Sequence, residues 1–444
     1  MLIRVSLLTL VAVNAFAQAG DWVATVAFEP DKLHLALHVT PHFTAMADSV
    51  DQDLFSLPVT RFKVQGRQIS FAIPRLSGRF SGTFAENAID GRWIQHQGGF
   101  PMRFERGNLR PQEPAPPYPY DEQKLVCHNG AIRLAGTLTS PRDAAPHPAV
   151  VLLTGSGPQD RNDTVSGHRP FLVWADYLTR RGFAVLRMDD RGVGGSSGKL
   201  LDSTDEDFAA DALAAVDFLS RRRDIDPRRI GLLGHSEGAV VAAIAAARSM
   251  DIAFVVLLAG PALPGDQILA AQSERIARVM GIPDDVERKN REIQQQLFTI
   301  VRRDPPAPAA RREMESLLSQ STASATPEQA AVIRGQIGSQ ISTAASRWFR
   351  FVLSYDPAVA LAKLACPVLA LYGSLDLQVP PELNVPAMKA ALAGNQLDEI
   401  AVIPELNHML QHAGTGSPVE YTQIEETVAP EVLKRVGDWM AAIR

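Results

Sequence analysis

The chain has 444 residues, of which 46% are hydrophobic and 21% are charged, and its formal net charge is -5. This balance is typical of a soluble globular protein and excludes a collagenous or natively disordered one. The length predicts two or three folding units. The mild acidic excess gives no reason to expect nucleic acid as a partner, because binding to its backbone requires clustered Lys and Arg.

Cysteine is sparse in this chain. Cys127 and Cys366 are too few for a disulfide scaffold or a cysteine-rich zinc domain. Whether these two residues pair with each other stays open, because pairing depends on their separation in space. We expect neither a metal nor an organic cofactor.

The first residues predict an export signal. Arg4 precedes an apolar run that ends in Ala15-Phe-Ala17, and small residues two apart are typical of a signal-peptidase site. Cleavage fits after Ala17 and also after Ala19. The run is shorter than the roughly 20 apolar residues that a membrane-spanning helix needs. We therefore expect residues 1–19 to be a signal peptide, the protein to be periplasmic or extracellular, and no integral membrane segment to be present.

The next part of the chain has the pattern of β-structure. Residues 20–106 alternate apolar and polar residues in short runs separated by Gly and Asn, which predicts about eight strands in a small barrel or sandwich. Residues 107–120 follow with many prolines, which continue neither a strand nor a helix. They are predicted to form a semi-rigid linker to the rest of the chain, residues 121–444.

From residue 121 short apolar runs alternate with helical periodicity. Such runs suit the strands of a parallel sheet covered on both faces, so the alternation predicts a doubly wound α/β sheet. The predicted strands are 150–153, 183–186, 230–233, 254–258, 368–371 and 400–403, and the predicted helices are 170–181, 207–223 and 237–249. Residues 265–350 interrupt the alternation with apolar residues at helical spacing. They predict a helical insertion, which is either extra packing or a cap over an active site.

A nucleophile motif lies between one predicted strand and helix. Gly234-His-Ser-Glu-Gly238 directly follows the strand 230–233 and precedes an Ala-rich helix. In that context G-x-S-x-G is typical of a tight turn that lifts its serine out of the sheet. Ser236 is therefore the candidate catalytic nucleophile.

A serine hydroxyl needs a base, and the base needs an acid that orients it. Asp376 follows the strand 368–371 and His408 follows the strand 400–403, so both lie at the carboxyl ends of strands, where sites of α/β sheets form. His412 competes with His408 but lies further beyond the strand. Asp356 precedes its strand and is predicted at the wrong edge, and His235 is interpreted as a packing residue beside the nucleophile.

The loop Thr154-Gly-Ser-Gly-Pro158 ends another predicted strand. Its glycines let the backbone approach a bound carbonyl, so the N–H of Ser156 or Gly157 could form an oxyanion hole with the N–H of Glu237. A phosphate-binding loop is excluded because no Gly-Lys-Ser/Thr follows. The Glu237 carboxylate is expected to complement the start of its helix.

Several of these segments together resemble a known family. The GHSEG turn, Gly155-Ser-Gly-Pro-Gln-Asp-Arg161, Asp189-Asp-Arg-Gly-Val-Gly194 and Leu406-Asn-His408 are similar to those of α/β-hydrolase-fold bacterial esterases near the serine aminopeptidase and dienelactone-hydrolase branches. The resemblance covers residues 120–444. It implies an α/β-hydrolase sheet with a helical cap insertion, preceded here by a small all-β domain. It leaves the substrate loosely defined.

The residues and the resemblance together predict a secreted serine hydrolase that cleaves small carboxylic esters through an acyl-enzyme. Ser236, His408 and Asp376 form its expected catalytic triad, and Glu237 and Ser156 its oxyanion hole. A serine peptidase of the aminopeptidase type or a thioesterase would use the same triad. A non-catalytic binding protein on this fold, or a binding role of residues 20–106, are the further alternatives. The oligomeric state stays open.

Overall fold

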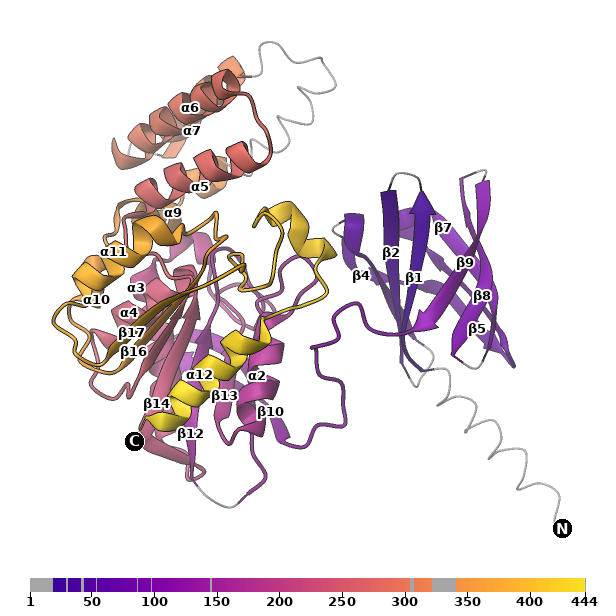
Figure 1. The fold of residues 1–444 in the computed structure, drawn as a ribbon, viewed down its shortest axis with the longest axis horizontal. Coiled ribbons are helices and arrows are strands. Elements are labelled where there is room, and N and C mark those ends of the chain that lie inside the picture. Colours follow the sequence, from indigo (N-terminus) through magenta and orange to yellow (C-terminus); the bar gives the residue numbers. More distant parts are fainter. Residues whose placement is uncertain are drawn as a thin grey trace. The chain divides into compact units, whose positions relative to one another are not determined.

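The computed structural model describes residues 19–28, 31–40, 44–52, 54–85, 87–96, 98–143, 146–303, 307–321 and 341–443. The predicted signal peptide therefore lies outside the described residues, apart from Ala19. The chain divides into two compact units (Figure 1). The first comprises residues up to Glu113 together with Val165–His168 and Tyr421–Glu426, and the second comprises the remainder. Among the described residues, no helix combines the length and the apolar character that crossing a membrane requires.

The first unit is built on one antiparallel sheet. Within the described residues its strands follow the order β4-β3-β2-β1-β9-β8-β7-β6-β5. Every second side chain along these strands faces the same side of the sheet. The large apolar ones there form its core, with Trp22, Phe80 and Phe104 buried. The strands are β1 (Gly20–Phe28), β2 (Asp31–Val39), β3 (Ala45–Ser49), β4 (Leu54–Pro58), β5 (Thr60–Gln65), β6 (Gln68–Ile73), β7 (Gly78–Phe84), β8 (Ala88–Gln95) and β9 (Gly98–Arg106), with single turns of 3-10 helix at η1 (Val50–Gln52) and η2 (Pro74–Leu76).

The edges of this sheet lie close together. β4 and β5 are the two outermost strands, yet Val59 alone connects them in the chain. Because consecutive Cα atoms are about 3.8 Å apart, the last residue of β4 and the first of β5 are neighbours in space. The sheet must therefore curl round on itself, which protects its edges and agrees with the barrel rather than the sandwich of the two forms predicted from the sequence.

The second unit contains an eight-stranded sheet in the order β10-β11-β13-β12-β14-β15-β16-β17. From β13 to β17 neighbouring strands pair in parallel, and β10 and β11 form an antiparallel hairpin at one edge. The strands are β10 (Asp121–Asn129), β11 (Ile132–Ser140), β12 (His147–Leu153), β13 (Ala184–Met188), β14 (Ile225–His235), β15 (Val255–Leu258), β16 (Val368–Gly373) and β17 (Asp398–Ile403). This is the predicted α/β-hydrolase sheet.

Helices cover both faces of this sheet (Figure 1). Val151 and Leu232 face α3 and α4, whereas Val150 and Leu233 face α2 and α12. Burial on both faces explains why these strands have continuous apolar runs rather than alternation. The helices are α2 (Pro170–Arg180), α3 (Asp205–Ser220), α4 (Glu237–Ala246), α10 (Ala358–Leu361), α11 (Pro381–Ala391) and α12 (Pro430–Ala442), with 3-10 turns η3 (Leu200–Asp202) and η4 (Pro418–Gln423).

The predicted helical insertion lies between β15 and β16. It contains α5 (Gly265–Val279), α6 (Asp284–Arg303), α7 (Ala307–Ser321) and α9 (Arg347–Ser354). Phe298, Met314 and Leu353 belong to a separate small core among these helices. The insertion is therefore a layer of its own at the side of the sheet where β14 and β16 end (Figure 1).

Candidate active site

The turn around Ser236 is strained in the way its motif predicts. Ser236 has φ 54° and ψ −118°, a conformation that residues with a side chain rarely adopt, between the end of β14 and the start of α4. A Cβ added to Gly234 would lie 2.1 Å from the carbonyl oxygen of Gly238, and one added to Gly238 would lie 2.1 Å from that of Leu153. Both flanking residues must be glycine for the turn to form. The turn presents Ser236 at the carboxyl end of β14.

His408 and Asp376 form a buried pair at the ends of the two neighbouring strands. The Nδ1 atom of His408 lies 2.9 Å from Oδ2 of Asp376. The other carboxylate oxygen of Asp376 accepts the N–H groups of Gln378 at 2.9 Å and Val379 at 2.8 Å, which fixes its orientation. When Nδ1 donates to this carboxylate, Nε2 of the neutral ring is left as a base.

His235 links the serine turn to this pair. Its Nε2 atom lies 3.1 Å from the carbonyl oxygen of His408, and the two imidazole rings are 5.0 Å apart between centroids. Ser236 directly follows His235, so the candidate nucleophile is the chain neighbour of a residue that contacts His408. The rival residues have other partners: His412 pairs with Glu431 at 3.1 Å, and Asp356 accepts an N–H at the start of α10.

The predicted oxyanion loop lies against the serine turn. A Cβ added to Gly155 would lie 3.7 Å from Cβ of Ser236. The hydroxyl of Ser156 interacts with the carboxyl of Glu237, the first residue of α4. The backbone N–H of Glu237 stands at a helix N-terminus, where negative charge is favoured. The loop and the helix start that should supply the two N–H donors are therefore adjacent.

Residues that the sequence did not assign hold this loop in place. Asp190 follows β13 and accepts the hydroxyl of Thr154 at 2.7 Å and the N–H of Gln159 at 2.9 Å. Burial raises the pKa of Asp190 to about 8, with a contribution from the charges of Asp163 and Glu237. The carboxyl of Asp190 thus holds both ends of the loop, and its burial there disfavours its ionised form.

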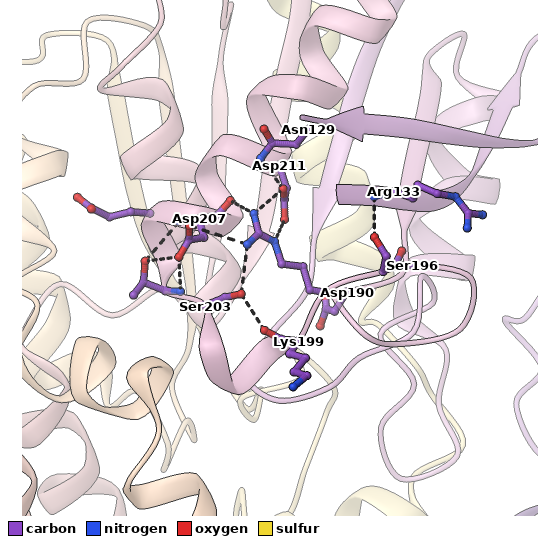
Figure 2. A network of polar contacts seen from close by, with 12 residues as sticks. Asn129, Arg133, Asp190, Ser196, Lys199, Ser203, Asp207 and Asp211 are labelled. Carbon is purple, nitrogen blue, oxygen red and sulfur yellow. Dashed lines mark hydrogen bonds and ion pairs between the residues drawn. The ribbon is translucent and has the colours of Figure 1, made fainter. Parts of the chain in front are cut away.

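The neighbours of Asp190 fasten the same segment to other elements. Asp189 accepts Nε and Nη2 of Arg161 at 2.9 and 2.6 Å. Arg191 donates to both carboxylate oxygens of Asp211 on α3, at 2.6 and 2.9 Å, and to the hydroxyl of Ser203 at 3.2 Å. Figure 2 shows Asp211, Asp207 and Ser203 surrounding this guanidinium. The Asp-Asp-Arg sequence therefore connects the oxyanion loop with α3.

His235 is more than the packing residue that the sequence suggested. Its Nδ1 atom lies 3.4 Å from Oδ2 of Asp163, while Oδ1 of Asp163 accepts the N–H of Gly155 at 3.3 Å. Burial disfavours the imidazolium, but Asp163 and the carbonyl of His408 outweigh it and raise the pKa of His235. Both ring nitrogens therefore face oxygen atoms, an environment that favours the protonated ring. His235 thus links the oxyanion loop to His408.

The Glu237 carboxyl also differs from the expectation that it complements its own helix. It accepts the indole N–H of Trp348 on α9 at 2.6 Å and interacts with Asp205 at the start of α3. No sequence signal connects residues so far apart in the chain. Cys127 and Cys366 are both free thiols. No set of three or more His, Cys, Asp or Glu side chains within the described ranges is arranged to hold a metal ion.

Comparisons with known proteins find a matching family, a relative and similar solved structures. The profile of a family described as serine aminopeptidase, S33, matches residues 170–413. The chain is 28% identical over 320 residues to Esterase EstD of Thermotoga maritima, covering 72% of this chain and 67% of the relative. Among solved structures, the Pyrococcus furiosus esterase Pf2001 is 16% identical, with a TM-score of 0.45 over 73% of this chain and 91% of that one. The proline iminopeptidase of Mycobacterium smegmatis is 16% identical, with a TM-score of 0.43 over 72% of this chain and 98% of that one.

Proposed function

This chain belongs to the serine aminopeptidase (S33) family of hydrolases, and from that premise we propose that it cleaves small carboxylic esters through a Ser236–His408–Asp376 triad. One observation carries the proposal: a serine in a strained strand–helix turn adjoins a buried His–Asp pair whose Nε2 is left as a base. This combination of a serine hydroxyl, a base and an orienting acid is what acyl transfer requires.

In the proposed reaction, the Oγ atom of Ser236 attacks the acyl carbon while Nε2 of His408 takes its proton. Asp376 stabilises the imidazolium that results. The N–H groups of Glu237 and Ser156 bind the oxyanion of the tetrahedral intermediate. The intermediate collapses when His408 returns the proton to the leaving alcohol, and an ester with Ser236 remains. His408 then takes a proton from water, which attacks the acyl carbon of this ester. His408 returns that proton to Oγ of Ser236 as the bond between Oγ and the acyl carbon breaks and the carboxylic acid leaves.

Two considerations favour esters over peptides. Esterase EstD, which covers most of this chain, is named for ester hydrolysis. An aminopeptidase needs a free carboxylate near the serine to bind the substrate amine. The carboxyl next to Ser236 is that of Glu237, and it is already engaged by Trp348 and Asp205.

Replacement of the nucleophile tests the proposal. We expect Ser236→Ala to reduce kcat/KM on p-nitrophenyl acetate and butyrate by on the order of 10³-fold or more, because the acyl-enzyme can no longer form. The matched control is Ser220→Ala, which removes a hydroxyl at the end of α3 that bonds only to Asp217 among the residues described. Equal ester turnover by parent and Ser236→Ala would refute the proposal, as would labelling of Ser236→Ala by a fluorophosphonate.

The export of this hydrolase is a second, sequence-based proposal. It rests on the Arg4 start, the apolar run and the Ala-x-Ala site described above. β1 begins at Gly20, so cleavage after either Ala17 or Ala19 leaves the first strand whole. Fractionation of cells that express the full chain would find the processed protein outside the cytoplasm, and an unprocessed cytoplasmic protein would contradict it.

A further inference from the structure

Three distant segments meet at the carboxyl of Glu237. The indole N–H of Trp348 donates to its Oε1 atom at 2.6 Å from the insertion helix α9. The hydroxyl of Ser156 reaches the same carboxyl from the oxyanion loop, and the carboxyl of Asp205 reaches it from the start of α3. The residue that follows the proposed nucleophile thus connects the insertion, the loop and a sheet-covering helix.

The contact between Glu237 and Asp205 requires a proton. Oε2 of Glu237 and Oδ1 of Asp205 are buried, and no N–H or O–H among the described residues donates to either atom. Two ionised carboxylates that face each other out of water repel strongly, whereas one proton between them supplies the missing hydrogen bond. Glu237 already accepts from Trp348 and Ser156. The proton therefore belongs on Asp205, which a backbone N–H approaches but which receives no side-chain donor from the part of the chain that the structure describes.

We propose, resting on the function proposed above, that Asp205 is a positioning residue whose protonated carboxyl donates to Glu237. The three-way contact of Glu237 then holds α9 and the oxyanion loop in the arrangement that acyl transfer at Ser236 needs. Loss of the proton places two negative charges in contact, and the carboxyl of Glu237 must move away from Asp205. Because Trp348 and Ser156 are hydrogen-bonded to the carboxyl of Glu237, both the insertion and the loop move when this carboxyl moves.

The surroundings of the pair favour retention of this proton. Burial raises the pKa of Asp205 well above 3.8 and, to a smaller degree, the pKa of Glu237 above 4.5. The other titratable groups near the pair are Asp190 in the loop after β13 and Tyr355 at the end of α9. Three arginines on adjoining elements, Arg347, Arg191 and Arg248, pair with Asp207, Asp211 and Glu206. These three cations are therefore engaged with other carboxylates.

The sign of the pH effect follows from these directions. A carboxyl whose pKa is raised by folding contributes stability that is present at low pH and is lost as the pH rises through the raised value. The arrangement around Glu237 is therefore intact in acid and at pH values up to the raised pKa of the pair. Above it, kcat/KM should fall because the oxyanion loop and α9 lose their common anchor.

The decisive variant is Asp205→Asn, whose amide donates to Glu237 without titrating. In the full chain with p-nitrophenyl butyrate, we expect its kcat/KM at neutral pH to stay within about threefold of the parent. We expect its alkaline decline to shift upward by about one pH unit or more. Asp217→Asn, an exposed acid on the same helix that pairs with Arg221, should keep the parent profile. Asp205→Ala has no group that donates to Glu237, so its kcat/KM should be lower than that of the parent by about tenfold or more at all pH values.

Two further variants guard against ambiguous outcomes. Asp190→Asn tests the other buried acid of the site: if the alkaline decline disappears in it and persists in Asp205→Asn, the proposal is overturned. If Asp205→Asn does not fold, Glu237→Gln replaces it, because its amide can donate to Asp205 while its oxygen accepts from Trp348. A parent-like alkaline decline in Glu237→Gln would equally overturn the proposal.

A measurement without substrate separates this inference from the proposed reaction. Urea midpoints across pH, taken on the Ser236→Ala background, should fall for that protein as the pH rises from about 4 through the raised pKa of the pair. They should fall less when Asp205→Asn is added. This result would support the carboxyl pair even if Ser236→Ala retained esterase activity. Identical alkaline destabilisation with and without Asp205→Asn would show that the pair holds no proton.

Discussion

The side chains on either side of Ser236 connect the serine turn to other elements of the second unit. His235 reaches back to Asp163 and to the backbone of His408, and Glu237 reaches forward to Trp348 and Asp205. Each connects the serine turn to a different element of the unit. The Gly-His-Ser-Glu-Gly motif therefore supplies the anchors of the site as well as its candidate nucleophile.

The raised pKa of the buried His235 leads to a prediction about pH. Because Asp163 raises its pKa, the stability that His235 contributes is fully present below about pH 6.5 and is lost as the pH rises through the raised value. The difference in unfolding free energy between the parent and His235→Gln should therefore be largest in mild acid and narrow in alkali. Urea denaturation across pH measures it. We also expect kcat to fall about tenfold at pH 7, since the glutamine cannot bridge both partners.

The control for this prediction is His412→Gln. His412 is exposed and pairs with Glu431 across the surface, so its removal should change kcat by less than about twofold. Comparison of the two variants separates the effect of removing the buried imidazole of His235 from the effect of removing any imidazole. A stability difference for His235→Gln that stays constant from acid to alkali would mean that His235 is neutral in the folded protein.

At the scale of elements, the junction of β14 and α4 has no space for additional atoms. We expect Gly238→Ala to lower the unfolding free energy by about 3 kcal/mol, because its Cβ would lie 2.1 Å from the backbone oxygen of Leu153. That oxygen belongs to a buried strand and cannot withdraw. The esterase activity should fall together with the stability, because α4 must shift to make room for the new Cβ atom and this shift displaces Ser236. Chemical denaturation and p-nitrophenyl ester assays measure the two effects.

Gly394→Ala is the matched control for this substitution. Gly394 follows α11, its φ is not in the left-handed region, and a Cβ there would meet nothing within 4 Å. Replacement of such a glycine stabilises a protein slightly, because it restricts the unfolded chain. If Gly238→Ala and Gly394→Ala had the same stability and activity, the close approach between α4 and β12 would be refuted.

Local pattern was sufficient to predict most elements of the second unit. The apolar run at 230–233 lies inside β14, and the predicted helix 207–223 corresponds to α3 at Asp205–Ser220. The hairpin of β10 and β11 was missed, because β10 lies at the edge of the sheet and most of its side chains are exposed. An edge strand carries no continuous apolar run by which the sequence could be recognised.

The polar contacts of the site could not be predicted for a different reason. Trp348 and Glu237 are 111 residues apart, and their hydrogen bond depends on how the insertion packs over α4. Periodicity reports which face of an element is buried, but it carries no information about which polar group another element brings there. The pairing of Asp376 with His408 was accessible to prediction because the carboxyl ends of parallel strands meet at one edge.

On the scale of the whole molecule, the first compact unit is not continuous in sequence. Arg110 donates to the carbonyl oxygens of Ile424 at 2.6 Å, Thr422 at 2.9 Å and Ser166 at 3.2 Å. These residues all belong to the unit that contains the curled β-sheet. The linker predicted at 107–120 therefore contains, near its start, a buried arginine that binds two later segments of the chain. Such a contact is invisible to an analysis of composition along the sequence.

This cluster should be sensitive to acid. His168 is buried, its Nε2 donates to the carbonyl oxygen of Tyr421 at 2.8 Å, and burial together with the charge of Arg110 lowers its pKa to about 3. The folded protein keeps His168 neutral, whereas the unfolded chain binds a proton below about pH 6.5. Stability is therefore lost as the pH falls from about 6.5 toward 3, which is the opposite direction from that of His235.

We predict that His168→Gln, which keeps a donor for Tyr421 but cannot titrate, removes part of this acid sensitivity. Between pH 7 and pH 5 the parent should lose about 2 kcal/mol more unfolding free energy than the variant. Trp22 and Trp93 lie in the core of the same unit, so urea unfolding followed by tryptophan fluorescence reports on it. His128→Gln, at an exposed position of β10, should retain the parent's acid response. Equal losses of unfolding free energy in the parent and His168→Gln would mean that His168 can be protonated without disturbing its contact with Tyr421. In that case a neutral imidazole would not be what holds the segments 165–168 and 421–426 together.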